Sequence, residues 1–284
     1  MAKGDLDTTA AWQSLNLYLP TRTHDEDYWW QKSGPQLAAL VEGAEYPLAK
    51  QYEALLFHYH WMVPYMGPSP LPEGAARQWK SLLQPDGTPI ECSWKWNTSR
   101  SPPDIRYDIE PIGPLAGTKA DPLNQHALRE MLHRLAGQVP NVDLTWCDHF
   151  LSTLFDHDLS KYVAESAAGK RPTTSGVIAA EFLESGTRFK TYFQPRKLGY
   201  TGIIPMKMWD EALEPIDPQR AARSMVKDFP ESTAAGQTLT CFSIAVDVVK
   251  LEKSRLKWYF NTPSTAFSIV REVMTLGGRL SSPH

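Results

Sequence analysis

Hydrophobic side chains recur along this sequence with two different periods, and the two periods alternate. Across residues 35–62, apolar positions return every three or four residues, which is typical of a helix that buries one face, with a break near Pro47. Residues 89–96 and 104–112 instead alternate in side-chain character, as strands between two environments do. The pattern therefore predicts helices followed by a pair of strands.

This order returns twice more along the chain. Helical spacing and then alternation predict these elements in turn: helices 123–137 and 144–154, strands 175–183 and 187–193, helices 205–213 and 218–229, strands 239–249 and 254–260, and a last helix 264–276. Asp121 and Pro122 fit a cap and first turn, while Gly277 and Gly278 fit a helix end. Repeated ααββ units predict an α+β fold, with helices on one side of an antiparallel sheet that curls toward a barrel. We expect one domain over residues 1–284.

Composition narrows the class of partners. The 29 Lys and Arg residues nearly balance the 32 Asp and Glu residues, and a net charge of −3 leaves no overall field that would attract nucleic acid or an anionic membrane. Three scattered cysteines suit reduced thiols better than a disulfide framework. The first residues lack the apolar run of a secretory signal, and no stretch approaches the ~20 apolar residues of a membrane span. We expect a cytoplasmic protein with small-molecule substrates and a homodimer as its candidate assembly.

Charged and phenolic side chains share one face of several predicted strands. In the strand 254–260, Arg255, Lys257 and Tyr259 fall on one face. In the strand 187–193 the same parity brings together Lys190 and Tyr192. Arg106 occupies the polar face of the strand 104–112, and Glu91 that of the strand 89–96. A solvated face is the ordinary explanation for one such strand, but the repetition favours a basic, phenol-lined interior.

Cations gathered inside a sheet repel one another unless an anion sits between them. A diphosphate meets that need through charge-assisted hydrogen bonds, and neighbouring tyrosine rings attract a carbocation without acting as strong nucleophiles. Glu91 could accept a hydrogen bond from an indole N–H and enrich the ring under attack. The residue types thus favour ionisation of an allylic diphosphate beside an aromatic acceptor.

Several ordered motifs carry a family resemblance. These are YWW, QYEALLFHYH, GTPIECSWKWN, IRYDIEPIG, FKTYF, SRLKWYF and SIVREVMTLGG. In that order they resemble the fungal dimethylallyltryptophan synthase family of indole prenyltransferases, over nearly the whole chain. The resemblance implies a closed barrel of antiparallel strands ringed by helices in ααββ units, of which about three of five would be present here.

The resemblance also implies roles for individual residues. Glu91 matches the glutamate that holds the indole nitrogen, and Leu83 matches a position near the aromatic substrate. The diphosphate ligands would be Arg106, Lys190, Arg255 and Lys257, and the shield of the allylic cation would be Tyr192 and Tyr259. Gln194 stands where some members carry another tyrosine. The implied reaction in alkaloid and secondary metabolism moves a dimethylallyl group from dimethylallyl diphosphate to tryptophan or another indole, with no metal or other cofactor in the chemical step.

The resemblance leaves three kinds of function open, because family members are considerably longer than this chain. They are an active prenyltransferase, a truncated inactive remnant, and a module that binds diphosphate or indole without turnover. Competing motifs are weaker. His58 and His60 diverge on a helix, Ser254 and Lys257 point to opposite faces of a strand, and no aspartate-rich metal motif accompanies Asp156.

Overall fold

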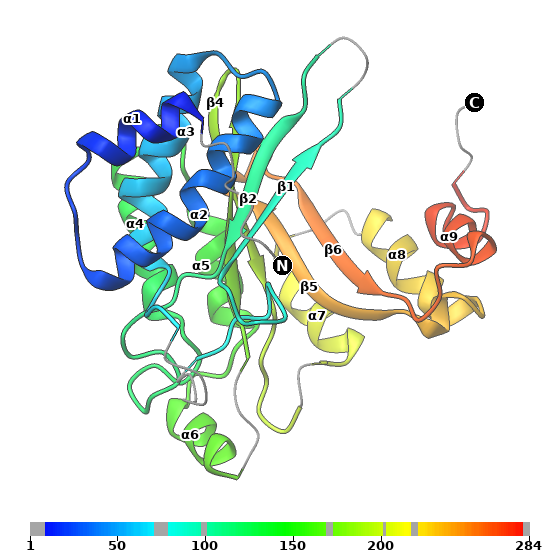
Figure 1. Ribbon diagram of the computed structural model, residues 1–284. Coiled ribbons are helices and arrows are strands. Elements are labelled where there is room, and N and C mark those ends of the chain that lie inside the picture. Colours follow the sequence, from blue (N-terminus) through cyan, green and yellow to red (C-terminus); the bar gives the residue numbers. More distant parts are fainter. Residues whose placement is uncertain are drawn as a thin grey trace.

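The computed structural model describes residues 9–70, 79–97, 101–168, 173–200, 203–216 and 221–280 (Figure 1). The helices are α1 (Ala10–Tyr18), α2 (His24–Gly43), α3 (Leu48–Phe57), α4 (His126–Gln138), α5 (Thr145–Thr153), α6 (Leu159–Ala167), α7 (Met206–Leu213), α8 (Ala221–Ser232) and α9 (Phe267–Met274). The strands are β1 (Ile90–Lys95), β2 (Asp104–Ile109), β3 (Gly176–Leu183), β4 (Gly186–Phe193), β5 (Thr240–Asp247) and β6 (Leu256–Asn261). A π-helical turn, His58–Met62, and a 3₁₀ turn, Val63–Tyr65, follow α3.

The strands form one antiparallel sheet in chain order, β1-β2-β3-β4-β5-β6. Each hairpin follows its helices, so the predicted succession of three ααββ units and a further helix is confirmed. Helices α1 and α6 were not predicted. Both are short, and the tertiary structure places Trp12 of α1 and Tyr162 of α6 in the interior.

The predicted and observed helix ends differ by about three residues in α4, α8 and α9, and by more at the start of α2. The first long helix was expected to begin near Pro35, but α2 begins at His24 and carries Pro35 inside it. The reason is a capping box, in which the Thr23 side chain accepts from the Glu26 backbone N–H and the Glu26 carboxylate accepts from the Thr23 N–H. Asp121 was expected as a cap and does accept from the backbone N–H groups of Gln125 and His126.

The core lies between the helices and one face of the sheet. Aromatic contacts join this face to successive helices: Phe57 of α3 meets Phe182, Phe150 of α5 meets Phe193, and Trp209 of α7 meets Trp258. The fit between α4 and β3 is tight, since a Cβ on Gly176 would stand 2.3 Å from the Leu128 side chain. Period-two alternation therefore gives the sheet one apolar face that the helices cover.

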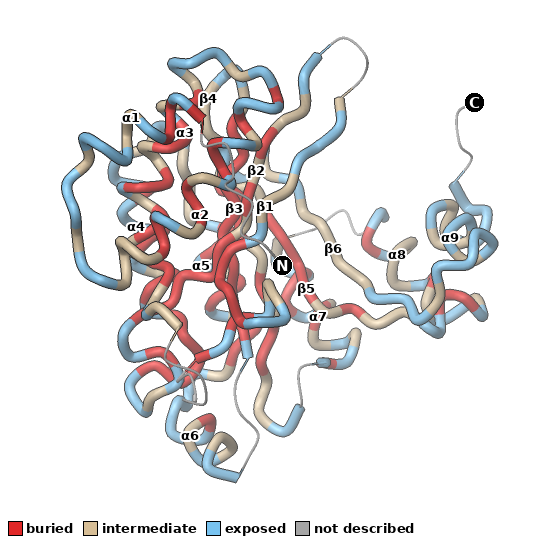
Figure 2. Tube along the Cα trace, in the orientation of Figure 1, coloured by how far each residue is buried: buried red, intermediate tan, exposed pale blue. Residues whose placement is uncertain are grey.

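Burial is uneven across the sheet. Figure 2 shows the buried trace running through the sheet centre and the helices beside it, and turning to intermediate and exposed along β6 and α9. Nearly all of β3 is buried, whereas β6 is intermediate in all but its last, exposed residue. In α9, Phe267 is 82% and Met274 75% exposed. Among the described helices, none combines the length and the apolar character that crossing a bilayer would need.

Candidate active site

The predicted site residues come together on the sheet face opposite the helices. On this polar face the register sets Glu91 of β1 beside Asp108 of β2 and Lys190 of β4 beside Asp247 of β5. One register step away, Arg106 of β2 lies beside Glu181 of β3. Farther along the sheet, Ala245 of β5 lies between Tyr192 of β4 and Lys257 of β6. Ser243 of β5 lies beside Tyr259 of β6. The prediction that these cations and tyrosines share one face is therefore consistent with the strand pairing.

Carboxylates already neutralise two of the four predicted cations. The Lys190 Nζ lies 3.1 Å from the Glu181 Oε2, and both side chains are buried. The Arg255 Nε and Nη2 lie 2.6 and 3.2 Å from the two oxygens of Asp247, a bidentate pair. Acidic residues on neighbouring strands therefore interleave with the cations and supply part of the counter-charge.

Lys257 is different from its neighbours. No ion pair or hydrogen bond of its ammonium is found within the described part of the chain. Burial lowers the pKa of Lys257, and the adjacent positive charges of Lys190 and Arg255 lower it further. An anion bound here would relieve that repulsion.

Two tyrosines stand beside these cations. The rings of Tyr192 and Tyr259 have their centroids 5.6 Å apart and are tilted by 54°. Burial raises the pKa of Tyr192 far above 10, and the negative charge of Asp108 raises it further, so its phenol stays protonated. Gln194 continues this face, and its buried Oε1 accepts no hydrogen bond from a described residue. Tyr192 and Tyr259 thus present two neighbouring aromatic faces.

Glu91 and Arg106 occupy the outer part of the face. Glu91 is exposed on β1, an edge strand among the described elements. Arg106 donates from its Nε to the Ser93 Oγ at 2.8 Å. Asp108 lies opposite Glu91 and two residues beyond Arg106 on β2. Burial raises the pKa of Asp108 to about 6. The charges of Arg106 and Lys190 oppose this rise, whereas those of Glu91 and Glu181 add to it.

The buried carboxylate of Glu110, just after β2, connects the end of this strand to two neighbouring segments through hydrogen bonds. Its Oε1 accepts from the Trp79 Nε1 at 2.7 Å and its Oε2 accepts from the Thr174 Oγ1 at 2.6 Å. The same threonine oxygen accepts from the Leu82 backbone N–H at 3.0 Å. This network holds the segment that carries Leu83, which is half-buried. Leu83 lies before β1, outside the strands that carry the other predicted site residues.

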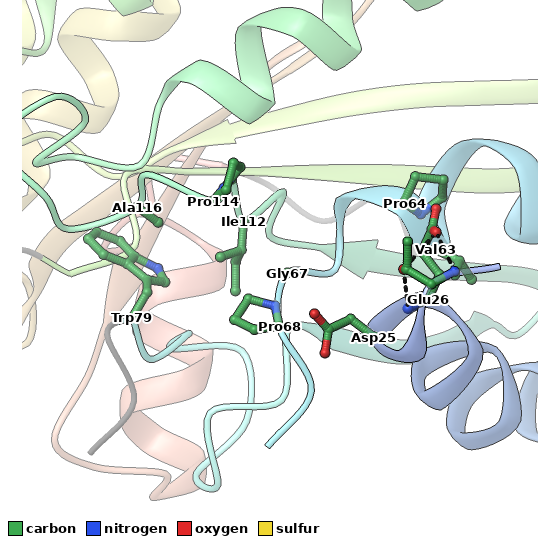
Figure 3. Close-up of a pocket in the computed structure, with 12 residues that line it drawn as sticks. Asp25, Glu26, Val63, Pro64, Gly67, Pro68, Trp79, Ile112, Pro114 and Ala116 are labelled. Atoms are coloured by element: carbon green, nitrogen blue, oxygen red, sulfur yellow. Dashed lines mark hydrogen bonds between the residues drawn. The ribbon is translucent and has the colours of Figure 1, made fainter. Parts of the chain in front are cut away.

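A cavity of about 520 Å³ lies elsewhere, between the start of α2, the Val63–Tyr65 turn and the loop near Pro114 (Figure 3). None of its lining residues is a predicted site residue. Its Asp25 accepts from the backbone N–H and the hydroxyl of Ser69, and these bonds lower the pKa of Asp25. Its other carboxylate, Glu26, caps α2. Both acids thus serve the local fold, and the cavity carries no chemistry of its own.

The discarded histidine pair is structural. His58 is buried, contacts the Ser33 Oγ at 2.7 Å, and has its pKa lowered to about 3 by burial. His60 lies 3.1 Å from an Arg22 nitrogen. Across the described ranges, no group of three or more His, Cys, Asp or Glu side chains is arranged to hold a metal ion.

The sequence analysis named Glu91 as an acid on the polar face, but it missed three further acids there. They are Asp108, Glu181 and Asp247. Asp108 has the same strand parity as Arg106, and that parity was the signal that could have found it. Glu181 and Asp247 lie on strands without a predicted site residue, and only the register places them on this face.

Known proteins match the chain in sequence and fold. The sequence model described as Tryptophan dimethylallyltransferase matches residues 25–284. The prenyltransferase anuH of Penicillium roqueforti is 53% identical over 276 residues, which cover 97% of this chain and 61% of that protein. Xanthone prenyltransferase B of Emericella nidulans is 47% identical over 275 residues, covering 96% and 59%. This chain therefore spans about three fifths of the length of these curated relatives.

Solved structures agree on the architecture. AnaPT from Neosartorya fischeri superposes with a TM-score of 0.82 at 28% identity, covering 97% of this chain and 70% of that one. NotF in complex with brevianamide F and DMSPP superposes with a TM-score of 0.80 at 26% identity, covering 95% and 68%. The open six-stranded sheet thus corresponds to part of a prenyltransferase barrel. By its sequence match and its fold, the chain belongs to the tryptophan dimethylallyltransferase family of aromatic prenyltransferases.

Proposed function

We propose that this chain transfers a dimethylallyl group from dimethylallyl diphosphate to an aromatic acceptor on the polar face of the sheet. The observation that carries the proposal is the cluster around Lys257, an ammonium with no ion pair or hydrogen bond among the described residues, which stands beside Lys190, Arg255 and two tyrosine rings. Family membership supports the same reaction.

In this proposal the cations act on the leaving group. As the allylic C–O bond breaks, its electron pair leaves with the diphosphate, and Lys257, Lys190 and Arg106 stabilise the growing negative charge. Arg255 is held by Asp247 and contributes through its free N–H groups. The aromatic faces of Tyr192 and Tyr259 stabilise the resulting allylic cation. The chemical step needs no metal ion in this scheme, since the protein cations supply the charge.

The acceptor is the second half of the proposal. Glu91 would accept a hydrogen bond from the N–H of tryptophan or another indole, and NotF, which was solved with brevianamide F, supports such an acceptor. Xanthone prenyltransferase B supports a hydroxylated polycyclic acceptor instead. Both acceptors are electron-rich rings that a carbocation alkylates.

Diphosphate binding without turnover is the second candidate function. It is favoured by the 60% exposure of the Arg255 side chain and by the exposure of Glu91, because water at these positions would trap an allylic cation. Calorimetry with dimethylallyl S-thiolodiphosphate would give a saturable heat for this candidate, while no prenylated product would form.

The deciding experiment combines the chain with dimethylallyl diphosphate, EDTA and either tryptophan or 1,3-dihydroxyxanthone, and detects products by mass spectrometry. We expect a product 68 mass units above the acceptor, the mass of an added C₅H₈, in the presence of EDTA. The Lys257→Met variant should lose about 100-fold in turnover. Lys253→Met, an exposed lysine on the loop before β6, is the matched control and should keep wild-type activity. A folded chain that yields no product with either acceptor would exclude turnover.

A further inference from the structure

Asp108 is the polar-face residue whose position the reaction above does not use. It lies in the middle of β2, opposite Glu91 on one side and Ala179 on the other. Beyond Ala179 the next residue in the row is Lys190. The small alanine separates the Asp108 carboxylate from the lysine by about two strand spacings, roughly 10 Å. In this row Glu91 and Asp108 lie on one side of Ala179, and Lys190 and Asp247 lie on the other.

The carboxylate of Asp108 is unsatisfied. Its Oδ1 is buried and accepts no hydrogen bond from any residue in the described ranges. Burying a charged oxygen without a donor is costly, and a second carboxylate directly across the strand, that of Glu91, adds repulsion. Such a pair becomes favourable when a bound molecule brings hydrogen-bond donors to it.

Donor count separates the two acceptor classes. An indole ring offers one N–H, which Glu91 can accept, and that would leave Asp108 without a partner. A polycyclic aromatic with two ring hydroxyls offers two O–H donors, one for each carboxylate. The register places Glu91 and Asp108 on the same side of Ala179, so one aromatic ring can contact both carboxylates.

We propose that Asp108 binds a ring hydroxyl of a hydroxylated aromatic acceptor and acts as the general base of its prenylation. The inference rests on the proposed prenyl transfer and names its substrate class. Glu91 accepts the second hydroxyl and orients the ring.

The allylic C–O bond breaks and its electron pair leaves with the diphosphate. A ring carbon beside the hydroxyl gives its π pair to the allylic carbon, forming the new C–C bond, while the hydroxyl proton passes to Asp108 and leaves a neutral dienone. The hydrogen on the alkylated carbon then shifts to the oxygen through solvent, which restores the aromatic ring, and Asp108 releases its proton to the diphosphate product.

Other charged or titratable groups surround this carboxyl. They are Glu91 and Cys92 on β1, Arg106 on β2, Glu181 on β3, and Lys190 and Tyr192 on β4. Because burial raises the pKa of Asp108 to about 6, the base becomes available only as the pH rises through that value. The turnover of a hydroxylated acceptor should therefore rise through about pH 6.

The first test compares Asp108→Asn with wild type on three acceptors: 1,3-dihydroxyxanthone, its 3-methyl ether and tryptophan. We expect kcat/KM for the dihydroxy compound to fall by about 100-fold or more, and for tryptophan by less than about 5-fold. The rise through pH 6 should disappear in the variant. Asp104→Asn, on the same strand and face and paired with Lys95, is the matched control and should change none of these values. Equal losses for all three acceptors, or no loss, would overturn the assignment.

The second test does not need turnover. Calorimetry measures binding of 1,3-dihydroxyxanthone to protein loaded with dimethylallyl S-thiolodiphosphate. Asp108→Asn should weaken this binding by about 10-fold and leave binding of the thiolodiphosphate unchanged, since one charge-assisted hydrogen bond is lost. A chain that binds both ligands without product would contradict the proposed turnover and still support Asp108 as a binding residue. Equal binding of the xanthone by both proteins, or none by wild type, would refute the role of Asp108.

Discussion

The two faces of one sheet use the same strands for opposite purposes. On the helix side, residues such as Tyr107 and Phe193 are fully buried and packed against aromatic partners. On the other side, the same strands carry Lys190 paired with Glu181, and Asp108 with an oxygen that lacks a donor. Alternation along each strand therefore gives its two sets of side chains different roles. The set on the helix side stabilises the fold, and the set on the other side carries charges whose burial is costly without a ligand.

Breaking the apolar face should have the largest effect on stability. Phe193→Ala removes a ring whose centroid lies 5.6 Å from that of Phe150, and we expect it to lower the free energy of unfolding by roughly 3–5 kcal/mol. Chemical denaturation would measure this loss. The folded fraction of this variant should keep its affinity for the thiolodiphosphate. If that affinity fell together with the free energy of unfolding, the two faces would not be independent.

Removing one partner of the buried ion pair should cost somewhat less. Lys190→Met leaves Glu181 buried without its cation, and we expect a loss of about 3 kcal/mol in the free energy of unfolding together with loss of thiolodiphosphate binding. The double variant Lys190→Met with Glu181→Leu should regain most of the stability, because no uncompensated charge remains. It should not regain binding, and recovery of both would show that Lys190 only stabilises the fold.

Glu110 sharpens the comparison, because it is an acid at the end of β2 whose oxygens are satisfied by donors such as Trp79 and Thr174. Glu110→Gln places an amide N–H₂ against one of these donors, so we expect it to lower the free energy of unfolding by about 2 kcal/mol. Melting curves would measure the change. The exposed Glu42→Gln is the control and should melt like wild type.

Asp108→Asn should have the smallest effect and the opposite sign. The pKa of Asp108 is about 6 in the folded protein against an ordinary 3.8, so the folded state binds the proton more tightly and loses stability as the pH rises between these values. Asparagine does not titrate, and we expect the variant to be about 1–2 kcal/mol more stable at pH 7.5 and equal to wild type below pH 4. Denaturation at both pH values checks this, with Asp104→Asn as control. A loss of stability at pH 7.5 would mean that Asp108 has a structural partner.

Local chemistry made much of this fold predictable. The ααββ succession followed from hydrophobic period, and the glycine end of α9 was confirmed by the Gly277 N–H bond to the Glu272 carbonyl and a φ of +69°. The start of α2 was missed because Pro35 resembles a helix start, although the Thr23 and Glu26 capping box lay in the sequence. Helices α1 and α6 escaped because their packing partners are distant in sequence.

The sequence by itself determined which side chains share a strand face, because parity is a local property of an extended chain. Arg106, Lys190 and Lys257 were assigned to the polar face on that ground. The neighbours of each side chain on adjacent strands depend on the tertiary structure, because the strand register joins segments that are far apart in the chain. Across these strands Lys190 forms an ion pair with Glu181, Lys257 has no ion-pair partner among the described residues, and the Asp108 and Glu91 carboxylates lie side by side.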